Sequence, residues 1–171
     1  IIGAMEQEVE LLKQNLSQRS DTIIEGIAFY RGQLSNHNVV IARCGIGKVN
    51  AAVITTILTS TFKPSKLLFS GIAGGLNDSL QPGDIVIGSS VGYHDYGKQM
   101  PDSFISWPTK HPGTFEENPM FFPADSNLLL LASNTARQTS LEAISNRPPK
   151  VVNGRILTGD CFMADGGAAT R

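Results

Sequence analysis

Three carboxylates stand close together near the start of the chain, at Glu6, Glu8 and Glu10. All three lie at the start of an expected helix, where the helix dipole stabilises negative charge, and this gives each of them a structural role. Glu8 also has a chemical interpretation. It lies just past the carboxyl end of the first apolar run, residues 1–4, where a carboxylate that faces a crevice can accept a proton from a water molecule.

Glycine follows an apolar run at four places in the chain, within residues 1–4, 39–47, 67–75 and 151–160. Glycine permits positive φ and lets the backbone approach a ligand closely, so that main-chain N–H groups can bind it. In an open α/β sheet, ligands bind at the carboxyl ends of the strands. We therefore expect several of these glycine-rich loops to line one crevice.

Two of the glycine-rich loops differ from the common nucleotide-binding patterns. Residues 45–48 have the sequence Gly-Ile-Gly-Lys and are followed by Val49, whereas a phosphate-binding loop has serine or threonine after its lysine. Residues 71–75 lack the G-x-G-x-x-G spacing of a dinucleotide site. Neither nucleotide-binding motif is therefore present.

Two further pairs of residues lie near expected strand ends. His94 and Asp95 are candidates for an orienting pair, although adjacent residues on a strand point to opposite faces. Asp160 and Phe162 follow the last glycine-rich loop. An aromatic ring at such a position either belongs to the core or stacks on a planar base.

The elements that must position these residues follow from the spacing of apolar residues and from turn signals. Helices are expected over residues 6–16, 48–62 and, capped by Asp125, up to about residue 140. Strands are expected over residues 23–34, with a break at 25–26, over 67–70 and over 85–88. Three further strands are expected to begin at residues 1, 39 and 151. This alternation predicts an α/β fold with helices on both faces of a sheet. The length of 171 residues and the 41% hydrophobic content favour a single domain over residues 1–171.

Residues 97–123 interrupt the alternation. They contain five prolines, four phenylalanines and the only tryptophan, without the period of a helix or a strand. Loops of this length in compact domains are usually functional or disordered, and the aromatic residues favour partial packing. We expect an irregular insertion that serves as a lid or a subunit contact, with a loop of no function as the alternative.

The composition excludes several classes of partner. The formal net charge is -1 and the sequence pI is about 6.3, which gives no electrostatic attraction for nucleic acid. No apolar run is long enough to span a bilayer, so no membrane partner is expected. Cys44 and Cys161 lie far apart and outside any CxxC or Cys/His cluster. We therefore expect no metal site, and reduced thiols in a cytoplasmic protein.

Five motifs together resemble those of one enzyme family. They are Gly3-Ala4-Met5-Glu6-Gln7-Glu8, residues 70–76, Pro82-Gly83-Asp84, Tyr93-His94-Asp95 and Thr158-Gly159-Asp160-Cys161-Phe162. In order and approximate spacing they are similar to the motifs of the methylthioadenosine/S-adenosylhomocysteine nucleosidases, which belong to the purine and uridine phosphorylase superfamily. The resemblance implies a three-layer α/β/α, nucleoside phosphorylase-like fold with a central mixed sheet, usually as a homodimer, with no metal or organic cofactor.

The resemblance also implies an activity and a set of site residues. The activity is hydrolysis of the N-glycosidic bond of 5′-substituted adenosines, a small-molecule nucleoside substrate class, with release of adenine for methionine salvage. Glu8 matches the catalytic carboxylate that activates the hydrolytic water. The positions that match the nucleoside-binding pocket are Ala4, Ile46, Ile72, Ala73, Gly74, Phe162, whose ring stacks on adenine, and Met163, whose backbone pairs with the base.

The chain departs from the family pattern in two respects. The segments that supply the ribose-binding glutamate and the purine-protonating acid do not occur before Arg171, so we expect the chain to lack C-terminal elements of the fold. Ile72 stands where several relatives have serine or threonine, which removes a hydroxyl from the water or phosphate site. The alternative interpretations are a nucleoside phosphorylase or a futalosine-type hydrolase of the same superfamily, and a non-catalytic nucleoside-binding module.

Overall fold

A computed structural model describes residues 1–161 and 163 of the chain. The chain divides into two compact units, Ile1–Ala73 and Gly74–Arg171, which are called the first and the second unit below. A single domain over residues 1–171 stays a prediction.

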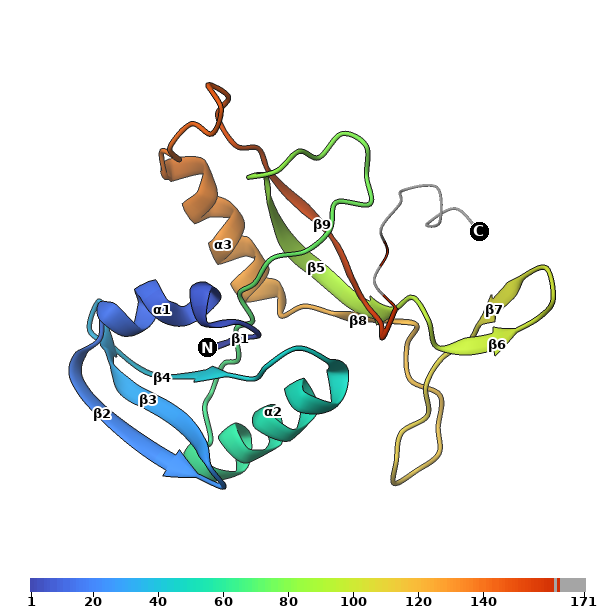
Figure 1. Cartoon of the computed structure of the whole chain (residues 1–171), viewed down its shortest axis with the longest axis horizontal. Helices are drawn as coiled ribbons and strands as arrows, with labels where there is room; N and C mark the ends of the chain where they lie inside the picture. Colours follow the sequence, from blue (N-terminus) through green and yellow to red (C-terminus); the bar gives the residue numbers. More distant parts are fainter. Residues whose placement is uncertain (162, 164–171) are drawn as a thin grey trace. The chain divides into compact units, whose positions relative to one another are not determined.

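The first unit combines a four-stranded sheet with two helices (Figure 1). Its elements are β1 (Ile2–Gly3), α1 (Glu6–Gln14), β2 (Ser17–Ile24), β3 (Ile27–Leu34), β4 (His37–Arg43) and α2 (Lys48–Phe62). The strand order is β1-β4-β3-β2, in which β1 is parallel to β4 and the other pairs are antiparallel. The helix predicted over residues 48–62 is confirmed at both ends.

Two tight turns connect the three antiparallel strands. Glu25 and Gly26 join β2 to β3 with φ values of 50° and 76°, and Ser35 and Asn36 join β3 to β4 with φ values of 46° and 68°. Two successive residues with positive φ are typical of the type I′ turn, whose twist matches that of the flanking strands. The strand break predicted at residues 25–26 is therefore confirmed.

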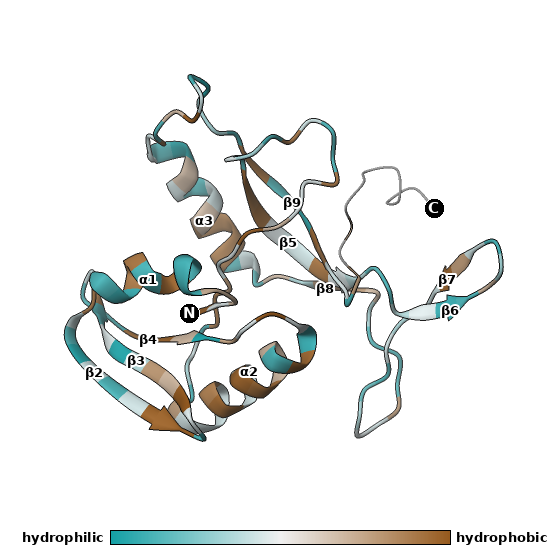
Figure 2. Ribbon diagram, viewed as in Figure 1, coloured by the Kyte–Doolittle hydropathy of each residue, from teal (hydrophilic) through white to brown (hydrophobic). Residues whose placement is uncertain are grey.

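The core of the first unit lies on both faces of its sheet. Ile41 and Ala42 are neighbours on β4 and point to opposite faces, yet each is 0% exposed. Ala42 packs in one cluster with Phe29 and with Leu58 of α2, whereas Val9 of α1 is fully buried outside that cluster. Figure 1 shows α1 and α2 on opposite sides of the sheet, and Figure 2 shows that α2 is hydrophobic along most of its length. The prediction of helices on both faces is confirmed for this unit.

Residues 67–70, which were expected to form a strand, make only one bridge, between Phe69 and Ile2. The main-chain N–H of Ile2 donates to the Leu68 carbonyl at 2.8 Å, and the Ser70 N–H donates to the Ile2 carbonyl at 2.9 Å. The expectation of a full strand is wrong because this ladder is too short. The bridge is parallel, so the segment still runs beside β1 in the same direction.

The described residues of the second unit form a three-stranded sheet, a hairpin and one helix. Its elements are β5 (Ile85–Tyr93), β6 (Gly97–Gln99), β7 (Phe104–Ser106), β8 (Phe121–Pro123), α3 (Ser126–Gln138) and β9 (Val151–Thr158). The strand order is β8-β5-β9, with β5 parallel to β9 and antiparallel to β8, and β6 pairs with β7 alone. Among the residues described in this unit, Gly92 is the only one that is buried.

The stretch 97–123, expected to be irregular, holds the strands β6, β7 and β8. Each has three residues, which is too short for an alternating pattern to show in the sequence. Asp125 caps α3 as predicted, since its Oδ1 accepts the Leu128 N–H at 2.9 Å, and the helix ends at Gln138. In the described part of the chain, no helix has the length and apolar character needed to cross a membrane.

Candidate active site

Three of the four glycine-rich loops meet at one edge of the first unit. β1 runs parallel to β4 on one side and to residues 67–70 on the other, so the carboxyl ends of all three segments lie at the same edge. Residues 4–5, 45–47 and 71–73 follow these ends. The predicted convergence of loops is therefore confirmed for these three, and the fourth, after β9, belongs to the second unit.

Glu8 lies at this edge and binds backbone groups of two of the loops. Its Oε2 accepts the N–H groups of Ala4 at 2.6 Å and Met5 at 2.8 Å. Its Oε1 accepts the N–H of Ile72 at 2.9 Å, across 64 residues of sequence. The carboxylate is thereby fixed in orientation by three neutral donors from the ends of β1 and of residues 67–70.

Two glycines make room for this carboxylate. A Cβ atom on Gly71 would lie 2.8 Å from Glu8 Oε1, and one on Gly3 would lie 3.1 Å from Glu8 Cβ and 2.7 Å from Val9 Cγ1. Contacts under 3.0 Å are not tolerated without movement. The glycines are thus required by the close approach of α1 and the 71–73 loop, as expected of backbone that approaches a polar group.

One hydrogen-bonding position on Glu8 is left for chemistry. A carboxylate has about four lone-pair sites, and the described part of the chain fills three of them. The remaining site is on Oε1. Glu8 also lines a cavity of about 470 Å³, together with Met5, Gln7, Ser70, Gly71 and Ile72. A water molecule in this cavity can donate to the open site of Oε1, which is the geometry that a general base requires.

The two glutamates beside Glu8 are engaged in structural contacts. Glu6 is paired with Lys13 and lies 3.6 Å from Arg43. The hydrogen bond from Lys13 is the main cause that lowers the pKa of Glu6, and the charges of Lys13 and Arg43 act in the same direction. Glu10 accepts a hydrogen bond from Gln14 at 3.2 Å on the exposed side of the helix. Of the three carboxylates, only Glu8 faces the cavity.

Cys44 is a neighbour of Glu8 whose place at this site is not evident from the sequence. Its N–H donates to the Gly3 carbonyl at 2.9 Å, and its thiol is buried directly before the Gly45 loop. Burial raises the pKa of this thiol, and the negative charge of Glu8 acts in the same direction. The only signal in the sequence is its position next to a glycine-rich loop.

The remaining predicted residues of the first unit surround the same edge. Ala4 is half-buried and Ala73 is exposed. Ile46 and Ile72 expose 76% and 80% of their surface, although both are large apolar residues. Large apolar side chains that are exposed together at one edge form a surface that a ligand can cover.

Two of the predicted residues are described in the second unit. Met163 is half-buried, and its carbonyl oxygen would lie 4.0 Å from a Cβ atom on Gly74. The two residues are thus close together. Phe162 lies outside the described residues.

The ends of β5 and β9 form a second parallel edge, within the second unit. The strands pair up to Tyr93 and Thr158, and the His94 N–H donates to the Thr158 carbonyl at 3.0 Å. Asp95 Oδ2 accepts the backbone N–H groups of Asp160 and Cys161. His94 and Asp95 were expected to point to opposite faces. Both instead lie against the position of Gly159, because β5 ends before them and they no longer follow the alternation of a strand.

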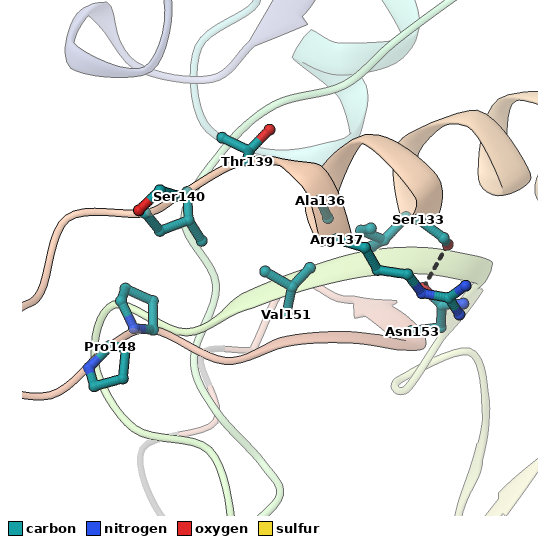
Figure 3. Close-up of a pocket in the computed structure, with 11 residues that line it drawn as sticks. Ser133, Ala136, Arg137, Thr139, Ser140, Pro148, Val151 and Asn153 are labelled. Atoms are coloured by element: carbon teal, nitrogen blue, oxygen red, sulfur yellow. Dashed lines mark hydrogen bonds between the residues drawn. The ribbon is translucent and has the colours of Figure 1, made fainter.

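The second unit has a cavity that is larger than the one beside Glu8, but it does not lie at the ends of β5 and β9 where His94 and Asp95 stand. It measures about 530 Å³ and lies between α3 and the start of β9 (Figure 3). Ser133 of α3 donates to Asn153 of β9 at 3.1 Å across it. Its lining has no aspartate, glutamate or histidine, and it opens at the amino end of β9, away from the glycine-rich loop. We therefore assign the candidate active site to the Glu8 edge.

No metal site was found in the part of the chain that the structure describes. Within residues 1–161 and 163, no three side chains of His, Cys, Asp or Glu come together in a group that could hold an ion. The two cysteines are free.

Known proteins with a similar sequence or structure share one superfamily. The family model of the phosphorylase superfamily matches residues 1–171. The 5′-methylthioadenosine/S-adenosylhomocysteine nucleosidase of Psychromonas ingrahamii is 40% identical in an alignment of 170 residues, and the alignment covers 96% of this chain and 65% of the relative. The chain thus spans about two thirds of the length of the curated relatives it matches.

Two solved structures agree with this relationship. The nucleosidase of the same name from Neisseria meningitidis, in complex with methylthio-immucillin-A, has a TM-score of 0.77 and 31% identity over 99% of this chain and 67% of its own. The nucleosidase from Colwellia psychrerythraea, in complex with adenine, has a TM-score of 0.77 and 36% identity over 99% of this chain and 64% of its own. These matches confirm the expected nucleoside phosphorylase-like fold. The chain belongs to the phosphorylase superfamily, and its resemblance to the methylthioadenosine/S-adenosylhomocysteine nucleosidases of that superfamily is confirmed.

Proposed function

We propose that the protein hydrolyses the N-glycosidic bond of 5′-substituted adenosines, such as methylthioadenosine and S-adenosylhomocysteine, and releases adenine. The names of its relatives support this substrate class. The observation that carries the proposal is the Glu8 carboxylate, held by three backbone N–H groups with one acceptor position open at a cavity.

Glu8 acts as the general base in this proposal. Cleavage of an N-glycosidic bond passes through an oxocarbenium-like sugar, and a water must then attack the anomeric carbon. Glu8 Oε1 accepts one proton of that water as the new C–O bond forms. The Ala4, Met5 and Ile72 N–H groups fix the carboxylate, so that little reorientation is needed during the reaction. The second role, protonation of the departing base, has no candidate among residues 1–171.

The same contacts favour hydrolysis over phosphorolysis. A phosphate nucleophile needs several hydrogen-bond donors, and glycine-rich loops at strand ends commonly supply them. Here the Ile72 N–H is taken by Glu8 at 2.9 Å, and the Ile72 side chain offers no hydroxyl. A carboxylate at this place also repels phosphate. Adenine release in phosphate-free buffer is therefore expected, and a strict requirement for phosphate would support the phosphorylase alternative instead.

The nucleoside is proposed to lie along the residues that match the family pocket. The Phe162 ring would stack on adenine and the Met163 backbone would pair with its edge. The other proposed pocket residues are Ala4, Ile46, Ile72, Ala73 and Gly74.

The test of the proposal is Glu8→Gln in the full-length protein. The amide keeps the shape of the side chain but cannot accept a proton from water, so hydrolysis should fall by about 10²-fold or more. Adenine binding, measured by calorimetry, should stay nearly intact. Glu10→Gln is the matched control, because Glu10 lies on the same helix and faces solvent.

Two results would contradict the proposal. Wild-type turnover in Glu8→Gln would exclude Glu8 as the general base. Its only remaining role would be the structural one of a carboxylate near a helix N-terminus. Adenine binding by the wild-type protein without any release of adenine from methylthioadenosine would support the non-catalytic nucleoside-binding module.

Three further properties are proposed from the resemblance. The protein would act in methionine salvage, in the cytoplasm, and as a homodimer. The exposed aromatic residues of the second unit, which include Trp107 and Phe115, support a dimer, because a monomer rarely leaves such apolar groups uncovered.

A further inference from the structure

The loop that leads from β9 to Met163 is tied to the end of the neighbouring strand by one carboxylate. We propose that Asp95 is a positioning residue, which holds residues 159–161 in place and through them orients the backbone of Met163, proposed above to bind adenine. This inference rests on the proposed function, because the role of Met163 in binding adenine comes from there.

The contact consists of two hydrogen bonds from consecutive peptide groups. Asp95 Oδ2 accepts the Asp160 N–H at 2.5 Å and the Cys161 N–H at 3.4 Å. The partners are 65 and 66 residues apart in sequence, so the contact joins two loops that no local turn connects. Hydrogen bonds to an ionised acceptor are about twice as strong as bonds between neutral groups.

Gly159 makes this approach sterically feasible. A Cβ atom there would lie 2.7 Å from Asp95 Oδ2 and would overlap the His94 ring. Every other residue at position 159 would therefore push the loop away from Asp95. A single contact thus explains two motifs of the sequence, Tyr93-His94-Asp95 and Thr158-Gly159-Asp160. The side chains of His94 and Asp95 fit against the backbone of Gly159, which has no side chain of its own.

The opposite end of the same strand pair has a similar contact with a different consequence. Asp84, just before β5, accepts the N–H of Lys150, just before β9, at 2.8 Å. It is also paired with Arg147 at 2.6 Å. That contact fixes the start of both strands, where no predicted site residue lies. Asp95 fixes the loop that ends only two residues before Met163.

Fixing the peptide groups of residues 160 and 161 restricts where Met163, two residues further on, can lie. The Met163 backbone is the group proposed to pair with the base, and a backbone partner cannot be adjusted by changing a side-chain rotamer. Its position depends on the path of the chain before it. Loss of the Asp95 contact should therefore weaken binding of the base and leave the chemistry at the Glu8 edge largely unchanged.

The experiment compares Asp95→Ala and Asp95→Asn with wild type in the full-length protein. Asp95→Ala should raise the Kd for adenine and the KM for methylthioadenosine by about tenfold, the loss expected when hydrogen bonds to a charged group disappear. The kcat should change by less than about threefold, because Asp95 has no part in the proton transfer proposed for Glu8. Asp95→Asn retains an acceptor oxygen and should recover most of the affinity for adenine. If the alanine variant does not fold, the same measurements can be made on Asp95→Asn, which should show a smaller loss in the same direction.

Asp125→Ala is the matched control for these measurements. Asp125 also accepts a backbone N–H with its carboxylate, at the start of α3, but it lies outside the β5 and β9 exits. Its loss should leave adenine affinity unchanged. Any general weakening of the second unit would appear in both variants.

Amide hydrogen exchange without ligand tests the contact independently of the proposed function. Exchange of the Asp160 and Cys161 amides should accelerate in Asp95→Ala and stay near wild type in Asp125→Ala. Unchanged adenine affinity in Asp95→Ala, or a fall in kcat equal to the rise in KM, would overturn the positioning role. A wild-type protein that binds no adenine, with the exchange result as expected, would count against the proposed function and leave the Asp95 contact established.

Discussion

The two units hold their parallel strands in different ways. In the first unit, β1 and β4 lie between α1 and α2, with Ile41 and Ala42 fully buried on opposite faces. In the second unit, β5 and β9 are tied at both ends by aspartates that accept backbone N–H groups, and Gly92 is the only buried residue among those described. Burial of side chains on both faces thus supports the parallel strands of the first unit, whereas in the second unit side-chain-to-backbone hydrogen bonds fix both ends of the β5 and β9 ladder.

The same comparison separates carboxylates that can do chemistry from those that only hold the structure. Glu8 and Asp84 each accept two or more backbone N–H groups. Asp84 is also paired with Arg147, and its side chain is 2% exposed. Glu8 has only neutral donors and faces a cavity. A cation and burial leave no place for a water on Asp84, whereas Glu8 keeps both the open acceptor site and the space.

The largest expected effect on stability comes from the core of the first unit. Phe29→Ala should lower its free energy of unfolding by about 3–5 kcal/mol, because Phe29 is 0% exposed and packs on Phe62. Amide hydrogen exchange in β3 and β4 measures this loss within the unit itself. The matched control is Phe121→Ala on the half-buried β8, which should cost about 1–2 kcal/mol. Equal losses of unfolding free energy in the two variants would contradict the conclusion that burial contributes more to the first unit than to the second.

The first unit was largely predictable from the sequence because its signals are local. The apolar spacing of α2 and the turn at Glu25 and Gly26 each fall within a few residues. The expected strand at 67–70 failed for a physical reason: its apolar residues make the same local pattern, but they form a bridge only through Phe69. The three-residue strands of the second unit are too short for any period to be seen.

The candidate site was predictable in its residue types and not in its contacts. Glu8 stood out because it follows a strand end near a glycine-rich loop. That its carboxylate would bind the Ile72 N–H depends on a pairing 64 residues apart, which no local pattern contains. The Asp95 contact could not be predicted for the same reason, because its partners are 65 and 66 residues away in the sequence. The expectation that His94 and Asp95 alternate failed because β5 ends at Tyr93.

A second prediction uses the exposed aromatic residues of the second unit. Trp107 and Phe115 expose 43% and 73% of their surface, and we expect a second copy of the chain to cover them. The double variant Trp107→Ser/Phe115→Ser should convert the proposed dimer to a monomer at micromolar concentration in sedimentation velocity. Ile23→Ser is the control, because Ile23 is equally exposed, at 74%, on β2 of the first unit. An unchanged dimer in the double variant would count against the subunit contact, and an unchanged KM for methylthioadenosine as well would favour the loop of no function.

The smallest expected effect is the acid sensitivity of the second unit, which depends on Asp84. The N–H groups of Lys150 and Gln81, and then Arg147, lower the pKa of Asp84 from 3.8 to about 2. Because the folded pKa lies below the unfolded one, this stabilisation is present above about pH 4 and is lost progressively as the pH falls through about 2. The only tryptophan, Trp107, lies in the second unit, so the urea midpoint of its fluorescence should fall over this range.

Asp84→Asn separates this effect from the titration of other carboxylates. The variant should have a lower urea midpoint than wild type at pH 5 and a much smaller difference at pH 2, because Asp84 is about half protonated in the folded wild-type protein there and most of its stabilisation is lost. Asp21→Asn is the control: Asp21 also has a lowered pKa, through its hydrogen bond from Arg19 on β2 of the first unit, and its loss should not move the Trp107 midpoint. If the urea midpoint of Asp84→Asn instead followed that of wild type at every pH from 5 to 2, the stability of the β5 and β9 pair would not depend on the charge of this carboxylate. Packing would then have to stabilise the second unit, as it stabilises the first.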